Sequence, residues 1–336
     1  MPATIHDVAR KAKVGIGTVS SVLNNSRPVN EETRKRVLAA IAELDFVPNS
    51  TGRRLSLGKT HMIGIVIPYF STPAQVERLR GAMSILAESE YDVSLFTVET
   101  ASQRKKILET VPHRGRIDGL IIFSLNPTEE DLYHIIQKNV PTVLVEAKHP
   151  DLHSIHLDDV AAAQEAVNYL IKLGHQKIGF ISDALNDSFG SHFSRNRYKG
   201  YCQALKRVGI PINPNYHQQG KVSRETARQM TLALLRLPEP PTAIFAYSDV
   251  QALGVLEAAR DLGIDVPDQL SIIGYDDIEI AYFARLTTVH QQLYESGVKG
   301  VELLFEVMNN PEMPLKCIQL PTQLVVRQTT APPQVN

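Results

Sequence analysis

Apolar residues in the first 46 positions recur every three or four residues, the spacing that lines up one face of a helix. Three such stripes predict three short helices within residues 4–46, with a tight turn at residues 13–15 between the first two. Thr4 and Asp7 have the spacing of a capping box, and Asn30 can cap the third helix. The residues expected to face inward are Ile5, Val8, Ala9, Ala12, Val19, Val22, Leu23, Val37, Leu38, Ile41 and Leu44.

From residue 62 onward the pattern changes to short β-rich runs that alternate with amphipathic helices. Strands are predicted at residues 62–67, 93–98, 119–124, 142–147, 177–182, 242–248 and 270–276. Helices are predicted at residues 73–89, 102–111, 128–138, 159–172, 195–208, 223–236 and 249–262. This alternation is typical of doubly wound parallel sheets, and its length predicts two α/β lobes with a break near Asp158.

Charge is spread unevenly along the 336 residues, although the formal net charge is only -1. Residues 1–60 hold ten Lys/Arg and five Asp/Glu, a surplus of five positive charges, and the remainder holds 25 and 31, a surplus of six negative charges. We call residues 1–60 the head. Because the head is basic and the rest of the chain is acidic, a polyanionic partner is predicted for the head alone. Because the second helix of a helix-turn-helix can enter the major groove, DNA is the expected partner.

Several other classes of protein are disfavoured by what the sequence lacks. Cys202 and Cys317 stand far apart and are expected to be buried free thiols, not a disulfide or a zinc site. His149, His153 and His156 fall in an irregular loop, where a surface or lobe-crossing role is favoured over metal binding. No apolar run approaches a membrane span and no signal-peptide core is present, which predicts a cytoplasmic protein without a membrane partner. No GxGxxG, P-loop or Ser/His/Asp pattern is recognisable, so neither an enzyme nor a cofactor is expected.

The basic head carries the most specific signal in the chain. The segment TIHDVARKAKVGIGTVSSVLNNSRPVNEETRKRVLAAIAELDFVPN closely resembles the N-terminus of the lactose-repressor (LacI/GalR) family. Further segments, among them LGHQKIGFI, RNRYKGYCQAL, AIFAYSDVQALGVLEAARDLGIDVPDQLSIIGYDD, LTTVHQQ and LPTQLVVRQTT, resemble that family's effector domain. The resemblance covers essentially the whole chain. It implies two periplasmic-binding-protein-like lobes between which the chain crosses near Asp158, His290 and Leu320.

The resemblance also implies which residues of the head contact DNA. Bases would be contacted by Ile16, Gly17 and Ser21. Many relatives carry longer polar side chains at the first two positions and an arginine at the third, so this chain departs from the pattern. Ile16 can touch a thymine methyl and Ser21 can make one hydrogen bond, but neither makes the bidentate contact of arginine with guanine. The residues expected to contact phosphates are Thr4, Thr18, Ser20, Asn24 and Thr33, with plain helix solvation as the alternative.

The linker after the head resembles the hinge helix of the same family. In that family a leucine wedges into the minor groove and bends the duplex, and PNSTGRRLSLG places Leu55 at this position. Arg53 and Arg54 would pair with phosphates, unless they are simply solvated. Gly52 stands where relatives usually have alanine, and glycine costs about 1 kcal/mol of helix propensity, so hinge folding is expected to depend on DNA.

In open α/β lobes ligands bind at the carboxyl ends of the strands, which predicts where an effector would lie. The residues directly after the predicted strands are Pro68, Tyr69, Phe70, Phe123, Ser124, Glu146, Asp183, Ser248, Asp249 and Asp276. Aromatic walls with carboxylates suit a small polyol or heterocycle. The resemblance adds Arg197 as the arginine that meets the effector and makes Asp276 its carboxylate counterpart. An exposed arginine and a helix N-cap are the respective alternatives.

These observations predict a sequence-specific DNA-binding transcriptional regulator, expected to be a repressor, under allosteric control by a small-molecule effector such as a sugar or sugar derivative. The domains would be a helix-turn-helix at 1–47, a hinge at 48–60 and an effector-binding and dimerisation domain at 61–336. Its N-lobe would comprise 61–157 and 290–319, and its C-lobe 158–289 and 320–330. A pseudo-palindromic operator and a symmetric homodimer are the expected partners, since no leucine heptad follows Thr330 to form a tetramer. The alternatives are a solute-binding protein without DNA-binding activity and a nucleobase-responsive regulator.

Overall fold

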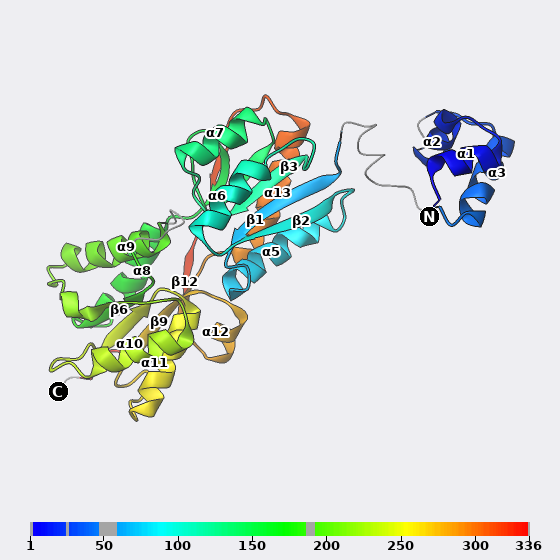
Figure 1. The fold of residues 1–336 in the computed structure, drawn as a ribbon. Coiled ribbons are helices and arrows are strands. Elements are labelled where there is room, and N and C mark those ends of the chain that lie inside the picture. Colours follow the sequence, from blue (N-terminus) through cyan, green and yellow to red (C-terminus); the bar gives the residue numbers. More distant parts are fainter. Residues whose placement is uncertain (1–2, 25–26, 47–58, 186–191, 335–336) are drawn as a thin grey trace. The chain divides into compact units, whose positions relative to one another are not determined.

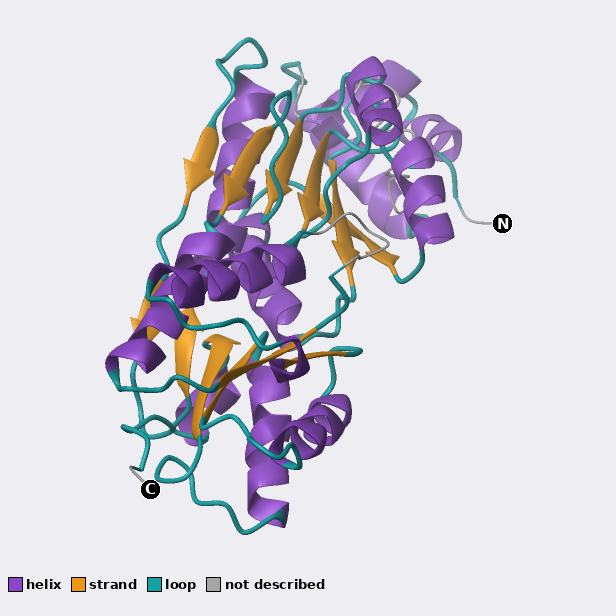
Figure 2. Ribbon diagram, turned by 90° about the vertical axis from the view of Figure 1, so that its left-hand side faces the viewer, coloured by secondary structure: helices purple, strands orange, loops and turns teal. Residues whose placement is uncertain are grey.

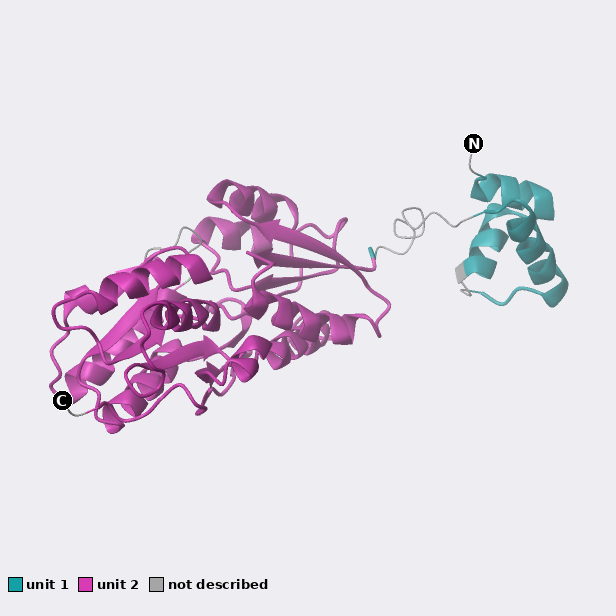
Figure 3. Cartoon of the chain, turned by 90° about the horizontal axis from the view of Figure 1, so that it is seen from below, with its two compact units in different colours: residues 1–60 teal, residues 61–336 magenta. Residues whose placement is uncertain are grey.

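The computed structural model describes residues 3–24, 27–46, 59–185 and 192–334. It divides into two compact units, Met1–Thr60 and His61–Asn336, coloured separately in Figure 3. The hinge residues predicted above, including Leu55, Arg53 and Arg54, lie outside the described residues. Each unit has its own core and is treated on its own below.

Unit 1 contains three helices in its described residues, α1 (Ile5–Ala12), α2 (Ile16–Asn24) and α3 (Glu31–Glu43), as predicted. The capping box at α1 is present, because Asp7 N donates to Thr4 Oγ1 and Thr4 N donates to Asp7 Oδ2. The core is built from all three helices and Phe46. One predicted core residue is wrong: the side chain of Leu38 is 49% exposed. Val37 takes the inner face of α3, which turns its neighbour in sequence toward the solvent.

The first lobe of unit 2, the N-lobe, is a six-stranded parallel sheet in the order β11-β5-β4-β3-β1-β2. Its strands are β1 (Met62–Pro68), β2 (Asp92–Val98), β3 (Gly119–Phe123), β4 (Thr142–Val145), β5 (His153–His156) and β11 (Cys317–Gln319). Its helices are α5 (Pro73–Leu86), α6 (Ala101–Thr110), α7 (Glu129–Gln137) and α13 (Leu293–Asn309). Ile63 and Ile65 of β1 share one core with α5 and α13, whereas Val66 shares the other with α6 and α7. Both faces of the sheet are therefore covered, which explains the nearly continuous apolar runs of β1, β3 and β4.

The second lobe, the C-lobe, repeats this plan with the strand order β12-β10-β9-β8-β6-β7. Its strands are β6 (Ile178–Ser182), β7 (His217–Gln219), β8 (Ala243–Ala246), β9 (Ser271–Asp276), β10 (Thr287–His290) and β12 (Gln323–Val325), the last of which pairs antiparallel with β10. The helices are α8 (Asp159–Lys172), α9 (Phe193–Arg207), α10 (Arg224–Leu235), α11 (Asp249–Asp261) and α12 (Glu279–Phe283), with a short 3-10 turn at Pro214–Tyr216. Helices α8 and α9 cover one face, and α10 and α11 cover the other. Figure 2 shows the strands of the two sheets with the helices around them. The two layered lobes confirm the predicted fold class.

The chain passes from one lobe to the other three times, between β5 and α8, between β10 and α13, and between β11 and β12 (Figure 1). In each sheet the first strand lies between the second and the third, so that β1 and β6 mark the points where the winding direction reverses. Ligands of doubly wound sheets bind beside such reversal points, at the carboxyl ends of the strands. The topology therefore points to the residues that follow these strands.

Several elements were absent from the sequence prediction. The long helix α13 was not predicted, nor were α12 and the short strands β5, β7, β10, β11 and β12. Cys317 was expected to be buried but is exposed on the edge strand β11, and its Sγ lies 3.3 Å from Ser154 Oγ. Cys202 is half-buried, and both thiols are free.

Helices α5 and α13 lie so close together that a side chain would not fit between them. A Cβ atom added at Gly297 would lie 2.0 Å from the carbonyl oxygen of Arg78 and 2.7 Å from the amide nitrogen of Ala82. Glycine is required here because the obstacle is backbone, which cannot swing away. This contact fixes the stretch of α5 that carries Arg78 beside the start of α13.

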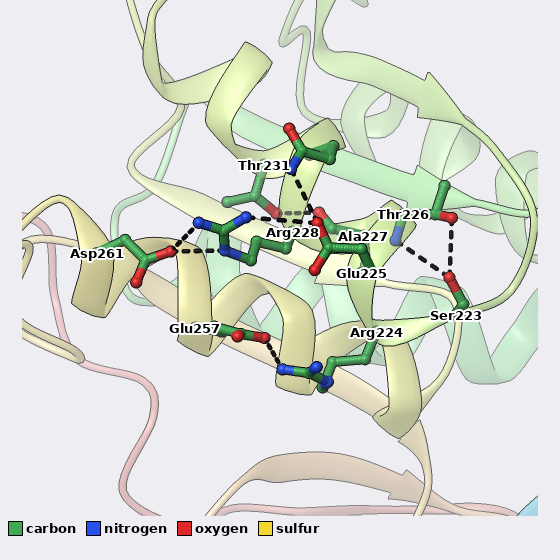
Figure 4. Close-up of polar contacts among 10 residues, drawn as sticks. Ser223, Arg224, Glu225, Thr226, Ala227, Arg228, Thr231, Glu257 and Asp261 are labelled. Atoms are coloured by element: carbon green, nitrogen blue, oxygen red, sulfur yellow. Dashed lines mark hydrogen bonds and ion pairs between the residues drawn. The ribbon is translucent and has the colours of Figure 1, made fainter.

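Charged side chains join α10 and α11 on the surface of the C-lobe. Arg228 lies between Glu225 and Asp261, with Nη2 2.6 Å from Asp261 Oδ2, and Arg224 pairs with Glu257 (Figure 4). These side chains are partly exposed, and such pairs contribute about 1 kcal/mol or less to stability. The charges that bear on function are the buried ones described below.

We expect Gly297→Ala to lower the free energy of unfolding of unit 2 by about 1–3 kcal/mol, because the added methyl forces α5 and α13 apart. Chemical denaturation followed by circular dichroism measures the change. Gly115→Ala is the matched control, since the nearest atom to its added Cβ is a His113 ring nitrogen at 3.5 Å. Equal losses in the two variants would contradict the close packing of α5 on α13.

Candidate nucleic-acid interface and ligand site

The outer surface of α2 carries the residues predicted to contact bases. Ile16, at the first position of the helix, is 42% exposed although it is a large apolar residue, and Gly17 is exposed beside it. An exposed isoleucine in the first turn of the second helix is available for apolar contact in a DNA groove. The side chain of Asn24, another predicted contact, lies outside the described residues.

A hollow of about 670 Å³ lies beside these residues, and four of the ten residues predicted to contact bases or phosphates line it. Its lining residues are Val14, Gly15, Gly17, Thr18, Ser21, Arg27, Pro28, Val29, Asn30 and Thr33. None of these is acidic and Arg27 is basic, so the hollow suits a polyanion. Gly17, Thr18, Ser21 and Thr33 are thereby brought together, and Ser20 is half-buried on the same helix.

Two of the predicted phosphate contacts also serve the local structure of unit 1. Thr4 Oγ1 donates to Asp7 Oδ2 at 2.6 Å as part of the α1 cap, and Thr4 does not line the hollow. Thr33 N donates to Asn30 Oδ1 at 3.1 Å, and Thr33 Oγ1 accepts from Arg36 Nη2 at 3.4 Å. The Thr4 hydroxyl is thus held by the α1 cap, and the Thr33 hydroxyl is held by Arg36 of its own helix.

In unit 2 the residues that follow the central strands adopt an unusual backbone conformation. Tyr69 after β1, Ser124 after β3, Glu146 after β4 and Asp276 at the end of β9 all have positive φ, between 46° and 119°. Tyr69 and its neighbour Phe70 are about two-fifths exposed, at 43% and 42%. Positive φ in side-chain-bearing residues is costly and clusters at ligand sites. The carboxyl ends of the strands are the part of the fold where this strain is concentrated.

Arg197 of α9 is buried against two aromatic rings and two acceptors. Its Nε donates to Asp159 Oδ1 at 2.9 Å and its Nη1 donates to Tyr247 O at 2.7 Å. The guanidinium lies 3.6 Å from the centre of the Tyr275 ring and 4.5 Å from that of Tyr247. The Tyr275 hydroxyl donates to the same oxygen of Asp159 at 3.0 Å. Arg197 is therefore part of a rigid aromatic and ionic cluster, and an exposed position on the helix is ruled out.

A second set of buried groups joins the two lobes, and we call it the interlobe network: Glu146, Arg78, Gln291 and Asp276. Glu146 Oε2 pairs with Arg78 Nη2, which also donates to Gln291 Oε1 at 3.0 Å. Gln291 Nε2 in turn donates to Asp276 Oδ1. Glu146 and Arg78 belong to the N-lobe and Asp276 to the C-lobe, while Gln291 lies in the connection between β10 and α13. All four side chains are at most 7% exposed.

Burial shifts the proton affinity of this network. It raises the pKa of Asp276 to about 6, against the opposing attraction of Arg197 and Arg78. Burial lowers the pKa of Arg78 to about 10, opposed by Asp276. A carboxyl group that titrates near neutral pH and lies beside two arginines is a functional-site candidate.

The remaining predicted ligand residues have internal partners. Asp249, which is fully buried, accepts from Thr288 Oγ1 at 2.5 Å and from Ile278 N at 3.0 Å, and burial raises its pKa well above the usual value. Ser248 caps α11 by accepting from Gln251 N at 3.3 Å. Phe123 is fully buried in the N-lobe core.

Two members of the interlobe network escaped the sequence reasoning. Arg78 lies on α5, and Gln291 lies at a lobe crossing. Their signal is weak in sequence, because a charged or amide side chain on an amphipathic helix normally faces solvent.

Possible metal ligands come together at one place among the described residues, on α6 and α7. Ligand atoms of Glu109, Glu130 and His134 lie within 4.8 Å of one another. Lys105 Nζ is 3.0 Å from Glu130 Oε1 and 3.8 Å from Glu109 Oε1, so a lysine already balances these carboxylates. His149, His153 and His156 do not belong to this group.

A basic three-helix head with an acid-free hollow, joined to two lobes of the periplasmic-binding-protein type, defines a ligand-responsive DNA-binding protein. Comparison with known families agrees: residues 4–49 match the bacterial regulatory proteins of the lacI family, and residues 167–330 match a periplasmic binding protein-like domain. The chain is 34% identical to catabolite control protein A of Priestia megaterium over 335 residues, covering 98% of this chain and 100% of that protein. It is also 34% identical to the transcriptional repressor CytR of Escherichia coli over 334 residues, covering 98% and 96%.

Solved structures give the same result. The lac repressor dimer bound to operator and an anti-inducer superposes with a TM-score of 0.83 at 27% identity, covering 98% of this chain and 100% of that one. The chain belongs to the LacI family of bacterial regulatory proteins. It is a DNA-binding transcriptional regulator and not an enzyme. Of the helices in the described residues, none has both the length and the hydropathy of a membrane span.

The raised pKa of Asp276 makes a prediction about stability and pH. Because the folded protein binds this proton more tightly than the unfolded chain, the contribution of Asp276 to stability is greatest below its unfolded pKa near 3.8 and falls as the pH rises to about 6. Asp276→Asn removes this loss, so the variant should gain up to about 3 kcal/mol relative to wild type between pH 4 and pH 7. Unfolding free energies measured across that range test this, and parallel pH curves would contradict it.

Proposed function

We propose that this regulator is a cytoplasmic dimeric repressor whose affinity for a pseudo-palindromic operator is set by a small molecule bound where the interlobe network joins the two lobes. The observation that carries the proposal is the network itself: buried polar groups from both lobes meet through Gln291. A ligand that contacts both lobes favours one angle between them, and that preference can bias an attached DNA-binding head.

A sugar or sugar derivative is the proposed class of effector. Among similar solved structures, CelR is described as a cellobiose complex, at 26% identity and a TM-score of 0.70. A LacI family regulator from Enterococcus faecium is described with bound ribose, at 26% identity and a TM-score of 0.71. Buried carboxylate, amide and guanidinium groups are suited to hydroxyl recognition. A nucleobase-responsive regulator is the alternative, and a thermal-shift screen of sugars against nucleobases separates the two.

Dimer formation is supported by an exposed aromatic surface on the C-lobe. Tyr282 and Phe283 of α12 are 62% and 67% exposed and lie edge to face, with ring centres 5.9 Å apart. Exposed aromatic patches of this kind mark protein interfaces. A second copy of the chain paired about a two-fold axis would cover them and present two heads to a symmetric operator.

DNA binding is proposed to use Ile16, Gly17 and Ser21 at bases, and Thr4, Thr18, Ser20, Asn24 and Thr33 with Arg53 and Arg54 at phosphates. Leu55 is proposed as the minor-groove wedge. We expect Leu55→Ala to weaken operator binding at least about tenfold and to reduce bending, without changing effector affinity, because the wedge acts only on the duplex. Gel-shift with phased-bend fragments measures both effects, and unchanged bending would show that Leu55 is no wedge.

Control by the effector is tested with Asp276→Asn. We expect it to lower effector affinity more than about tenfold through loss of a charge-assisted hydrogen bond, while effector-free operator affinity stays the same. Calorimetry with a hit from the thermal-shift screen, and gel-shift with and without that compound, measure the two quantities. Arg197→Ala is a poorer probe, since it strands Asp159 in a buried site. An effector response equal to that of wild type would remove Asp276 from the ligand site.

A further inference from the structure

Buried positive charge in the described part of the chain is matched one to one by carboxylates. Three arginines are buried there: Arg78, Arg104 and Arg197. Arg78 pairs with Glu146, Arg104 with Asp131 and Arg197 with Asp159. The arginines at the proposed ligand site, Arg78 and Arg197, therefore bring no uncompensated positive charge to it.

Hydrogen-bonding capacity, in contrast, is left over on the N-lobe side of the site. Among the described residues, the buried atoms Glu146 Oε1, Gln75 Oε1, Ser124 Oγ and Arg78 Nε have no partner. These atoms belong to one neighbourhood. Ser124 N donates to Val145 O at 2.7 Å, which places Ser124 beside Glu146. Gln75 lies one turn before Arg78 on α5, on the same side of the helix.

We propose that Gln75, Arg78, Ser124 and Glu146 form the N-lobe wall of the ligand site, and that this wall selects an effector that is uncharged or positively charged and donates a hydrogen bond to Glu146. The inference rests on the proposed function and narrows its ligand class. Phosphorylated and carboxylated compounds are excluded by the same wall. Arg78 acts as a positioning residue, because it holds Glu146 through one oxygen and leaves the other for the ligand.

The physical reason is the cost of burying charge. An anionic ligand would lose its hydration and meet no unpaired cation in return, while its charge would lie close to the carboxylates of Glu146 and Asp276. A hydroxyl or ammonium group instead satisfies an acceptor that is already dehydrated. An unpaired buried acceptor is unfavourable because it has lost its hydration, so a donor placed there recovers that free energy.

A role confined to stability accounts for the ion pair but not for the unpaired second oxygen of Glu146. A carboxylate kept only to neutralise Arg78 would be most stable with both oxygens hydrogen-bonded, as Asp249 is in the C-lobe. Glu146 instead has a positive φ of 57°, and one of its oxygens is buried without a partner. Backbone strain and an unpaired acceptor at one residue are typical of a site completed by a ligand.

The test needs no knowledge of the effector and uses the full chain with inorganic phosphate as the probe. Thermal unfolding of wild type is measured in phosphate and in chloride of equal ionic strength. We expect no phosphate-specific stabilisation of wild type. In Glu146→Gln the charge of Arg78 is no longer compensated, and we expect phosphate affinity to rise at least about tenfold.

Two further variants make the result specific. Glu77→Gln removes a partly exposed carboxylate, from the pair with Arg80 on the same helix, and should gain no phosphate affinity. Arg78→Gln combined with Glu146→Gln should lose the gain, which separates the wall from phosphate bound by the basic head. Glu146→Gln without any gain would overturn the proposal. So would a phosphate effect in wild type that Arg78→Gln abolishes, and this comparison decides the matter even if Glu146→Gln does not fold.

A screen of matched compounds separates this inference from the proposed function. Sugars and nucleosides are tested against their phosphates and uronates by thermal shift, and hits are tested for an effect on operator binding. Hits confined to neutral or amino compounds support the wall. A phosphorylated or carboxylated hit that alters operator binding would contradict the charge selectivity of the wall, but it would still support control of the regulator by an effector. If no compound altered operator binding and the phosphate experiment gave its expected result, effector control would fail while the charge selectivity of the wall stood.

Discussion

Arg78 can be buried only because Glu146 lies against it, and this requirement governs much of unit 2. The two residues come from α5 and from the end of β4, so their pairing demands that helix and sheet meet at a set distance. Gly297 lets α13 pack closely on α5, and Gly300 lets it pack on Val145 of β4. Gln291, just before α13, accepts from the guanidinium of Arg78. From Gln291 the polar chain continues to Asp276 in the other lobe. Breaking one member leaves a charge buried without compensation, which costs far more than a surface pair does.

Two residues of the interlobe network, Glu146 and Asp276, are also among those with a strained backbone at the strand ends. Tyr69, Ser124, Glu146 and Asp276 each turn through a conformation that L-residues avoid, at the edge where both sheets present their carboxyl ends. The turn lets a side chain leave the strand direction and enter the space above the sheet. Since the cores below are apolar and complete on both faces, these residues can be strained without loosening the fold. The stable cores of the lobes thus offset the cost of the strained residues at the carboxyl ends of the strands.

Most of the regular structure could be predicted from the sequence, because helical and strand periodicities come from burial of one or two faces. The head, the predicted βα units and the class of fold followed from patterns that span only a few residues. Helix α13 was missed because Gly297 and Gly300 interrupt its apolar stripe. The reason for these glycines is visible only in the fold, where α5 presses against Gly297 and Val145 of β4 presses against Gly300. Leu38 was predicted to face the core, but it is exposed, although the helix that carries it was predicted correctly.

The site was predictable in outline and not in its chemistry. The strand-end rule located Glu146 and Asp276, and the family resemblance located Arg197. Arg78 could not be recognised, because in QVERLRGA it looks like its neighbours Glu77 and Arg80, which are more exposed. What distinguishes Arg78 is a partner 68 positions later in the sequence. Phe123 was expected to face a ligand, and it packs in the core instead. Contacts between distant segments leave no periodic trace in the sequence.

The three lobe crossings also set an order in which the protein can be completed on the ribosome. The C-lobe is contiguous from α8 to β10 and needs only the short edge strand β12 from later in the chain. The N-lobe begins first but is completed only after the contiguous part of the C-lobe, because α13 and β11 follow β10 in the chain. Until α13 is synthesised, the apolar side chains of β1 and α5 lack the cover that this helix gives them. During synthesis of the C-lobe, the unfinished N-lobe therefore has an open apolar face. At this stage of synthesis the chain is most exposed to aggregation and to binding by chaperones.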